Sequence, residues 1–68
     1  MLTRIKLCRL QIGARQLELS QRAGITRQRL SELECGYVEP RADELERLAD
    51  ALGLPVGELT VPVPGVGA

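Results

Sequence analysis

Apolar residues recur at every third or fourth position along much of the chain, which is the spacing of helices that bury one face. The pattern is clearest in residues 16–33, where Gly24 interrupts it once. Glycine enters the left-handed conformation that ends many helices without a steric cost, and Thr26 can cap the helix that follows. We therefore predict two short helices, at about residues 16–23 and from Arg27 to Glu34 or Cys35, joined by a tight turn as in a helix-turn-helix. Their apolar positions are Leu19, Ala23, Ile25, Leu30 and Leu33.

Two further helices and a last turn are predicted outside this stretch. One helix is expected at Leu2–Ile12, and another begins just after Pro40 and ends at Gly53. A short helical turn is expected in residues 55–59. The core positions expected in these elements are Leu2, Ile5, Cys8, Ile12, Leu45, Leu48, Ala49, Leu52, Val56 and Leu59. The fold class is all-α, with one domain at residues 1–60 and a flexible C-terminal tail at residues 61–68.

Overall composition is ordinary, but the distribution of charge is informative. The 68 residues include no Phe or Trp and one Tyr, so the core must consist of small and aliphatic side chains. Net charge is zero, yet residues 1–30 carry seven basic side chains and one acidic one, a balance of +6, whereas residues 31–68 carry −6. Such asymmetry predicts a basic face turned to a polyanion and an acidic face turned away from it.

Several classes of protein are disfavoured by what the chain lacks. Without histidine or a Cys-x-x-Cys pair, Cys8 and Cys35 do not provide a metal site. There is no activated nucleophile and no glycine-rich phosphate loop, so we expect no enzyme, no cofactor and no small-molecule ligand. No segment is long and apolar enough for a signal peptide or a membrane span, and a cytoplasmic protein is the default expectation.

The helix that begins at Arg27 carries positive charges at the end where the helix dipole disfavours them. Arg27 and Arg29 lie in its first turn, where the positive end of the helix dipole costs each cation roughly 0.3–1 kcal/mol. Residues that are energetically unfavourable at their position in a helix often mark functional sites. An anion held at the helix terminus would remove the conflict, and DNA phosphate is the obvious candidate.

Together these segments resemble the lambda-repressor-like (Cro-type, XRE) class of helix-turn-helix DNA-binding domains over about residues 2–59. The matching elements are IKLCR in the first helix, Gln16, then LSQRAGI at residues 19–25, TRQRLSELECG at residues 26–36 and PRADELERLADALG at residues 40–53. The resemblance implies a compact five-helix bundle whose third helix enters the major groove of double-stranded DNA. It also implies a transcriptional regulator that binds a two-fold symmetric operator.

By this resemblance, the positions that read bases are Thr26, Arg27, Gln28 and Glu32. Their chemistry agrees, because Arg can donate two hydrogen bonds to guanine, Gln can pair with adenine, Glu can accept from cytosine, and the Thr methyl can contact thymine. The alternative is a polar helix face that is merely solvated. For Glu32 two roles remain open, since a carboxylate near DNA either reads a cytosine or is held by Arg29 or Arg27.

A second group of positions is expected to bind phosphate, namely Arg15, Gln16, Arg29, Tyr37 and Arg41. Gln16 resembles the family's phosphate anchor at the start of the second helix, where side chain and backbone amide act together. Arg15 beside it is a poor N-cap, which a role as a second anchor would explain. The loop after the third helix lacks the Lys or Arg often found in relatives. Tyr37 either donates its hydroxyl to a phosphate or lies over the core, and Arg41 is a candidate for the missing charge.

Arg9 and Glu34 match two residues that form an ion pair between the first and third helices of similar domains. The implied role of this pair is structural. Replacing one partner would leave the other charge without compensation, at a cost of roughly 3–5 kcal/mol if the pair is well buried.

A single reading helix contacts too few base pairs to define a site in a genome, so a homodimer is expected. Its surface is predicted at the C-terminal end, at Leu54, Val56 and Leu59, with Val61 and Val63 as an extension. The rival surface consists of Leu7, Leu10 and Leu17. These leucines would also serve the alternative function, a protein-binding adaptor of the antitoxin-like or coactivator-like kind, or they are scattered surface residues without a role.

Overall fold

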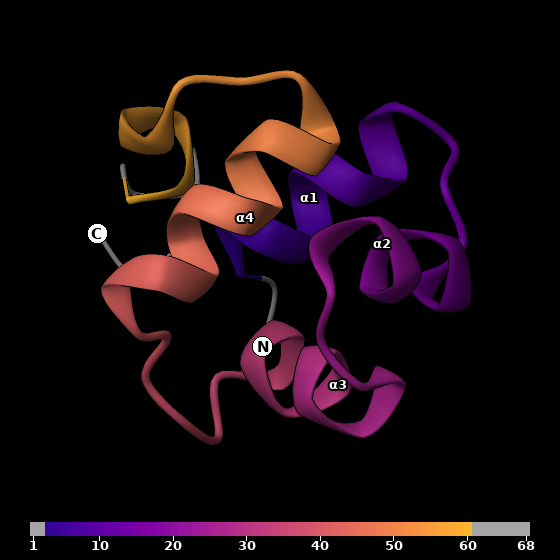
Figure 1. The fold of residues 1–68 in the computed structure, drawn as a ribbon, viewed down its shortest axis with the longest axis vertical. Helices are drawn as coiled ribbons and strands as arrows, with labels where there is room; N and C mark the ends of the chain where they lie inside the picture. Colours follow the sequence, from indigo (N-terminus) through magenta and orange to yellow (C-terminus); the bar gives the residue numbers. More distant parts are fainter. Residues whose placement is uncertain (1–2, 61–68) are drawn as a thin grey trace.

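Four α-helices and one 3₁₀ turn follow one another along residues 3–60, the part of the chain that the computed structural model describes (Figure 1). They are α1 (Arg4–Gln11), α2 (Gln16–Ala23), α3 (Arg27–Cys35), α4 (Ala42–Leu52) and η1 (Val56–Leu59). The predicted all-α class is confirmed. The longest helix, α4, has 11 residues, and none of the described helices could cross a membrane. The predicted tail at residues 61–68, with Val61 and Val63, and the expected core position Leu2 lie outside the described residues.

The fifth helix implied by the resemblance is a single 3₁₀ turn, so the expected count of five helices was slightly wrong. In η1 the N–H of Glu58 donates to the carbonyl of Pro55 at 3.0 Å, and the N–H of Thr60 donates to Gly57 at 3.2 Å. A segment of four residues is too short for successive i to i+4 bonds, and it closes with the tighter i to i+3 bonds instead. Within residues 3–60 the bundle therefore consists of four α-helices and a closing turn.

α1 is shorter at both ends than the apolar pattern indicated. Thr3 caps the helix, because its hydroxyl accepts the N–H of Lys6 at 3.2 Å, and the helix begins at Arg4. At the other end Ile12 is the C-cap, and its side chain is 49% exposed. The prediction of Ile12 as a core residue was wrong, because a residue beyond the last turn no longer follows the helical period.

The turn between α2 and α3 has the conformation that the sequence indicated. Gly24 adopts a φ of 70°, and the hydroxyl of Thr26 accepts the N–H of Arg29 at 3.0 Å. Gly36 ends α3 in the same left-handed conformation, with a φ of 76°. The bounds of both helices agree with the prediction, because each end is set by a signal within a few residues of it.

The core lies where α2 packs against both α3 and α4, and α1 closes it against α3 and η1 (Figure 1). Its buried apolar side chains are Ile5, Cys8, Leu19, Ala23, Leu30, Leu33, Leu48, Ala49, Leu52 and Leu59. Ile25 and Leu45 are only partly buried at its edge. Val56 was wrong as a core position, since it is 38% exposed and only Leu59 of this short turn reaches the interior.

Candidate nucleic-acid interface

Arg15 begins α2 without capping it through its side chain. A guanidinium has no acceptor, so the cap is made in the opposite direction, with Glu18 accepting the backbone N–H of Arg15 at 3.1 Å. The guanidinium of Arg15 is left at the surface, beside the amino end of α2. The start of α2 is therefore better capped than the presence of Arg15 suggested. A glutamate at the third helical position is the sequence feature that indicates such a cap.

The residues predicted to read bases lie on α3 or at its N-cap. Thr26, Arg27 and Gln28 are exposed, and Glu32 is half-buried one turn further along. The opposite face of α3 is buried in the core. The hydroxyl of Thr26 is used in the cap, which leaves its methyl group for a contact with a partner. One face of α3 is therefore available over its first two turns.

A shallow hollow joins this face to the start of α2. It has a volume of about 370 Å³ and is lined by Gln16, Arg27, Gln28 and Ser31. The structure thus brings the predicted phosphate anchor beside two of the predicted base readers. Ser31 was missed by the sequence reasoning, although its spacing of four from Arg27 and three from Gln28 places it on the same helix face.

Gln16, which lines the hollow, also belongs to a buried polar network centred on Glu34. Its carboxylate accepts two hydrogen bonds from Arg9, from Nε at 2.6 Å and from Nη2 at 3.0 Å. The side-chain amide of Gln16 donates a third, to Oε1 at 3.1 Å. Glu34 is 1% exposed and Arg9 is 9% exposed. Gln16 therefore has a partner inside the domain, which the sequence did not indicate.

The same network also fixes the chain around it. Nη1 of Arg9 donates to the carbonyl of Ala14 at 2.9 Å, in the connection between α1 and α2. The hydroxyl of Thr3 donates to the backbone carbonyl of Glu34, also at 2.9 Å. In residues 3–60 every buried side-chain nitrogen and oxygen has a hydrogen-bond partner. A buried charge pair is stable only when satisfied in this way, and the satisfied pair sets where α2 begins relative to α3.

Arg29, predicted to bind phosphate, lies against Glu44 of α4. Its Nε and Nη2 donate to the two carboxylate oxygens at 2.8 Å each. Hydrogen bonds from Arg29, with a further bond from the backbone N–H of Arg41, outweigh the effect of burial and lower the pKa of Glu44 to about 2. The same contact raises the pKa of Arg29.

Glu32 is not held by either arginine that was considered for it. Within residues 3–60 its carboxylate forms no ion pair, and the hydrogen bonds of the Arg29 side chain go to Glu44 and to the carbonyl of Glu39. Of the two roles left open for Glu32, the reading of a base stays a prediction.

The loop between α3 and α4 carries the remaining predicted phosphate ligands. Tyr37 is 80% exposed, so it does not lie over the core, and its hydroxyl is open to a partner. The side chain of Arg41 is 73% exposed and forms an ion pair with Asp43 at 3.2 Å. No group of three or more His, Cys, Asp or Glu side chains in the described part of the chain could hold a metal ion.

Two short helices joined by a tight turn at Gly24, with one face of the second helix buried and the other presenting arginine and glutamine, define a helix-turn-helix protein. A helix-turn-helix family model matches residues 5–59, which is most of the chain, and the protein therefore belongs to the XRE, or lambda-repressor-like, helix-turn-helix family. The family resemblance found in the sequence is confirmed. Membership of this family indicates a DNA-binding regulator of the XRE type.

The burial of Glu34 leads to a first prediction, on stability. Arg9→Met should lower the free energy of unfolding by about 3–5 kcal/mol, because it leaves a buried carboxylate without its partner. Arg4→Met is the matched control, since Arg4 also forms an ion pair, with Glu58 at 2.9 Å, but the Glu58 side chain is 48% exposed. Its loss should be about 0–1 kcal/mol. Urea unfolding measures both; equal losses would contradict the buried role of Arg9.

The lowered pKa of Glu44 leads to a second prediction, on pH. A depressed carboxyl pKa adds stability above the ordinary value of 4.5, and this share is lost as pH falls from there toward 2. Glu44→Gln should therefore cost about 1–2 kcal/mol at neutral pH, less than the full shift implies because the pair is partly solvated. The difference from the parent protein should shrink between pH 5 and pH 3, as measured by chemical unfolding at each pH.

Glu46→Gln is the control for this experiment. Glu46 lies on the same helix but is exposed, so its replacement should have only a small effect on stability. A constant difference between the parent protein and Glu44→Gln over the acidic range would contradict the assignment.

Proposed function

We propose that the protein is a sequence-specific transcriptional regulator that inserts α3 into the major groove of a two-fold symmetric operator and binds as a dimer. The observation that carries the proposal is the exposed first turn of α3. There Arg27 and Gln28 line one hollow with Gln16, while the other face of the helix is buried. An α-helix held by its apolar face, with long hydrogen-bonding side chains on the other, fits the width and the chemistry of the major groove.

Within this proposal, the contacts divide into those that read bases and those that bind phosphate. Thr26, Arg27, Gln28 and Glu32 are the base-reading candidates, because they occupy the outer face of α3. Phosphate contacts come from the amino end of α2, at Arg15 and Gln16, and from the loop after α3, at Tyr37 and Arg41. Arg29 belongs to the second group only indirectly, since its Nε and Nη2 donate to Glu44.

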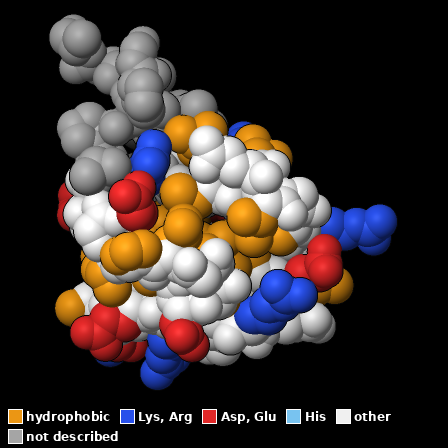
Figure 2. All heavy atoms as spheres, turned by 90° about the horizontal axis from the view of Figure 1, so that it is seen from above, with side chains coloured by type: hydrophobic (Ala, Val, Ile, Leu, Met, Phe, Trp, Pro, Cys, Tyr) orange, Lys and Arg blue, Asp and Glu red, His pale blue; other side chains and the backbone are white. Residues whose placement is uncertain are grey.

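The dimer surface that we propose lies at the C-terminal end. Val56 is 38% exposed and Leu54 is partly buried, whereas Leu59 is 6% exposed and belongs to the core. Figure 2 views the molecule from the side on which the connection between α4 and η1 lies, and apolar side chains reach the surface there with charged side chains around them. Pairing through this region would leave α3 of both copies available to DNA.

A second candidate function, a protein-binding adaptor, rests on a different apolar region. Leu10, Ile12 and Leu17 are about half exposed, at 53%, 49% and 54%, near the end of α1 and the start of α2. Leu7 from the same predicted group is half-buried. Salt dependence separates the two functions, because binding to DNA weakens steeply with salt and binding through leucines does not.

The third prediction tests base reading. Arg27→Ala and Gln28→Ala should each relax preference at one or two base pairs and cost about 1–3 kcal/mol on the preferred site, which is first identified by selection from a random DNA pool. Arg15→Ala is the matched control and should weaken binding to all sequences alike. Gln16→Ala is less suitable, because its amide also contacts Glu34. Unchanged base preference in both α3 variants would mean that another element reads the DNA.

The fourth prediction tests the dimer. Val56→Glu places a charge on an exposed site and should weaken self-association and operator binding together, as followed by sedimentation and by gel shift. Leu10→Glu is the control on the rival surface and should leave the dimer intact. Leu59→Glu would unfold the domain, since its side chain is buried. A folded Val56→Glu protein that still sediments as a dimer would exclude the C-terminal surface.

A further inference from the structure

α3 and α4 are linked largely through side chains. α2 packs against each of them, while α3 and α4 have few direct contacts with each other. Besides the hydrophobic core that both helices share, Arg29 links them directly, because it reaches from the first turn of α3 to both carboxylate oxygens of Glu44. Its Nη2 also lies 3.4 Å from the carbonyl of Glu39, in the loop between the two helices. One arginine thus holds the reading helix, the following helix and the loop that joins them.

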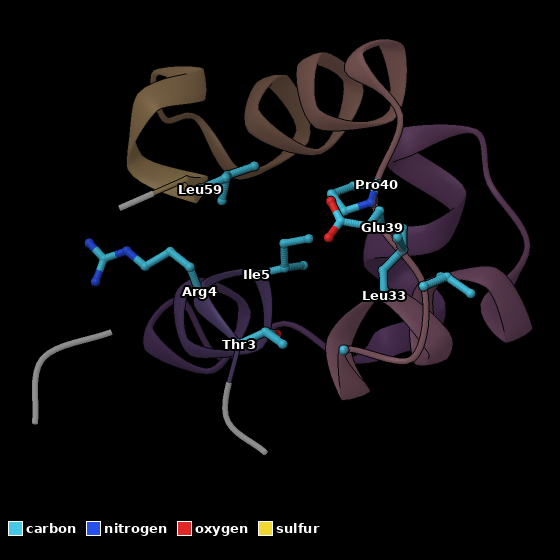
Figure 3. A pocket seen from close by; sticks show the side chains of 9 residues that line it. Thr3, Arg4, Ile5, Leu33, Glu39, Pro40 and Leu59 are labelled. Carbon is cyan, nitrogen blue, oxygen red and sulfur yellow. The ribbon is translucent and has the colours of Figure 1, made fainter. Parts of the chain in front are cut away.

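The loop between Gly36 and Arg41 is fixed at its two ends. At the first end the N–H of Tyr37 donates to the carbonyl of Glu32 at 3.1 Å, which closes the last turn of α3. At the second end the N–H of Arg41 donates to Oε1 of Glu44 at 2.8 Å. Between these ends Val38 packs against the core, and Glu39 and Pro40 line a hollow with Leu33 (Figure 3). The position of the second end of the loop therefore depends on where Glu44 is held.

The negative charge of Glu44 gives a reason for its contact with Arg29. Glu44 lies at the amino end of α4, beside a loop proposed to contact phosphate, where an uncompensated carboxylate would repel the DNA backbone. The Glu44 side chain is only 9% exposed and that of Arg29 is 31% exposed, so water screens this charge only in part. To bind phosphate through Nε and Nη2, Arg29 would have to break two hydrogen bonds of 2.8 Å and leave Glu44 without its partner. The pair is more stable intact.

We propose that Glu44 is a positioning residue for DNA binding, which acts through Arg29. It holds the loop of residues 36–41 so that the hydroxyl of Tyr37 and the backbone amides of the loop meet the phosphates, and Arg29 stays on Glu44 in the complex. This inference rests on the DNA-binding function proposed above. It assigns Arg29 an indirect role, in place of the direct phosphate contact that its position on α3 indicated.

The experiment compares two variants that remove the same negative charge from α4. Coulomb's law alone requires that Glu44→Gln and Glu46→Gln both tighten binding to DNA, since each removes one repulsive carboxylate. Our proposal requires opposite signs. Glu46→Gln should tighten binding slightly, whereas Glu44→Gln should weaken it by roughly threefold or more, because its amide no longer holds Arg29 with a carboxylate's strength.

The measurement is fluorescence anisotropy with a mixed-sequence duplex of about 20 base pairs, two turns of B-DNA, over about 50 to 200 mM salt. All proteins are measured well below their melting temperatures, with circular dichroism confirming the fold, so that lost stability does not count as lost affinity. Tighter binding by Glu44→Gln, with a steeper salt dependence, would show that the released Arg29 binds phosphate, and it would overturn the proposal. Unchanged affinity would reduce Glu44 to a structural role and would also overturn it.

A second variant keeps the test decisive if Glu44→Gln does not fold. Arg29→Lys retains the positive charge but cannot form the bidentate contact with Glu44. Our proposal predicts weaker binding by a similar factor, whereas a direct phosphate contact through charge would leave the affinity nearly unchanged.

The variant Tyr37→Phe tests whether Glu44 affects DNA binding through the loop. In the parent protein it should weaken binding, and in the Glu44→Gln background it should have little further effect, since the loop is already misplaced. Additive losses would contradict an action through the loop. If the parent protein itself fails to bind any DNA in a salt-dependent manner, the proposed function fails, which is a different outcome from a parent that binds and a Glu44 variant that binds more tightly.

Discussion

The arrangement of the first three helices depends on one buried charge. Glu34, 1% exposed, receives hydrogen bonds from Arg9 on α1 and Gln16 on α2, and its backbone carbonyl accepts from Thr3. An ionised carboxylate at this depth is stable only when its partners are in place, so each partner's helix is constrained by it. The same constraint places Gln16 beside the outer face of α3. The buried polar network and the proposed DNA-contact surface thus share Gln16.

Two acidic residues cap the helix starts at which arginines lie. Glu18 and Glu44 each accept the backbone N–H of an arginine that occupies the N-cap of its helix, Arg15 in one case and Arg41 in the other. This leaves the guanidinium groups at the surface, where they can meet phosphate, without an uncapped helix end. In the second case Glu44 also compensates Arg29. Each of these two carboxylates therefore stabilises the helix start at which its arginine lies.

The helices and turns could be predicted well from the sequence, and the errors in that prediction have local causes. α2 and α3 were placed at their observed bounds because Gly24, Thr26 and Gly36 act on neighbouring residues. Ile12 and Val56 were wrongly assigned to the core because a repeating apolar pattern does not reveal where a helix has stopped or tightened into a 3₁₀ turn. The pairing of Arg9 with Glu34 was predicted from the family resemblance, because no pattern of neighbouring residues indicates it.

The sequence by itself determined the all-helical class, the turn of the helix-turn-helix and the face of α3 that is left polar, since these follow from periodicity and from caps a few residues apart. The tertiary structure alone decided which charges are already paired. Arg29 meets Glu44 across 15 residues, and Gln16 meets Glu34 across 18. Tyr37 is exposed, whereas the next residue in the loop, Val38, packs against the core. Such contacts depend on how whole helices pack, and the spacing of residues along the chain contains no record of that.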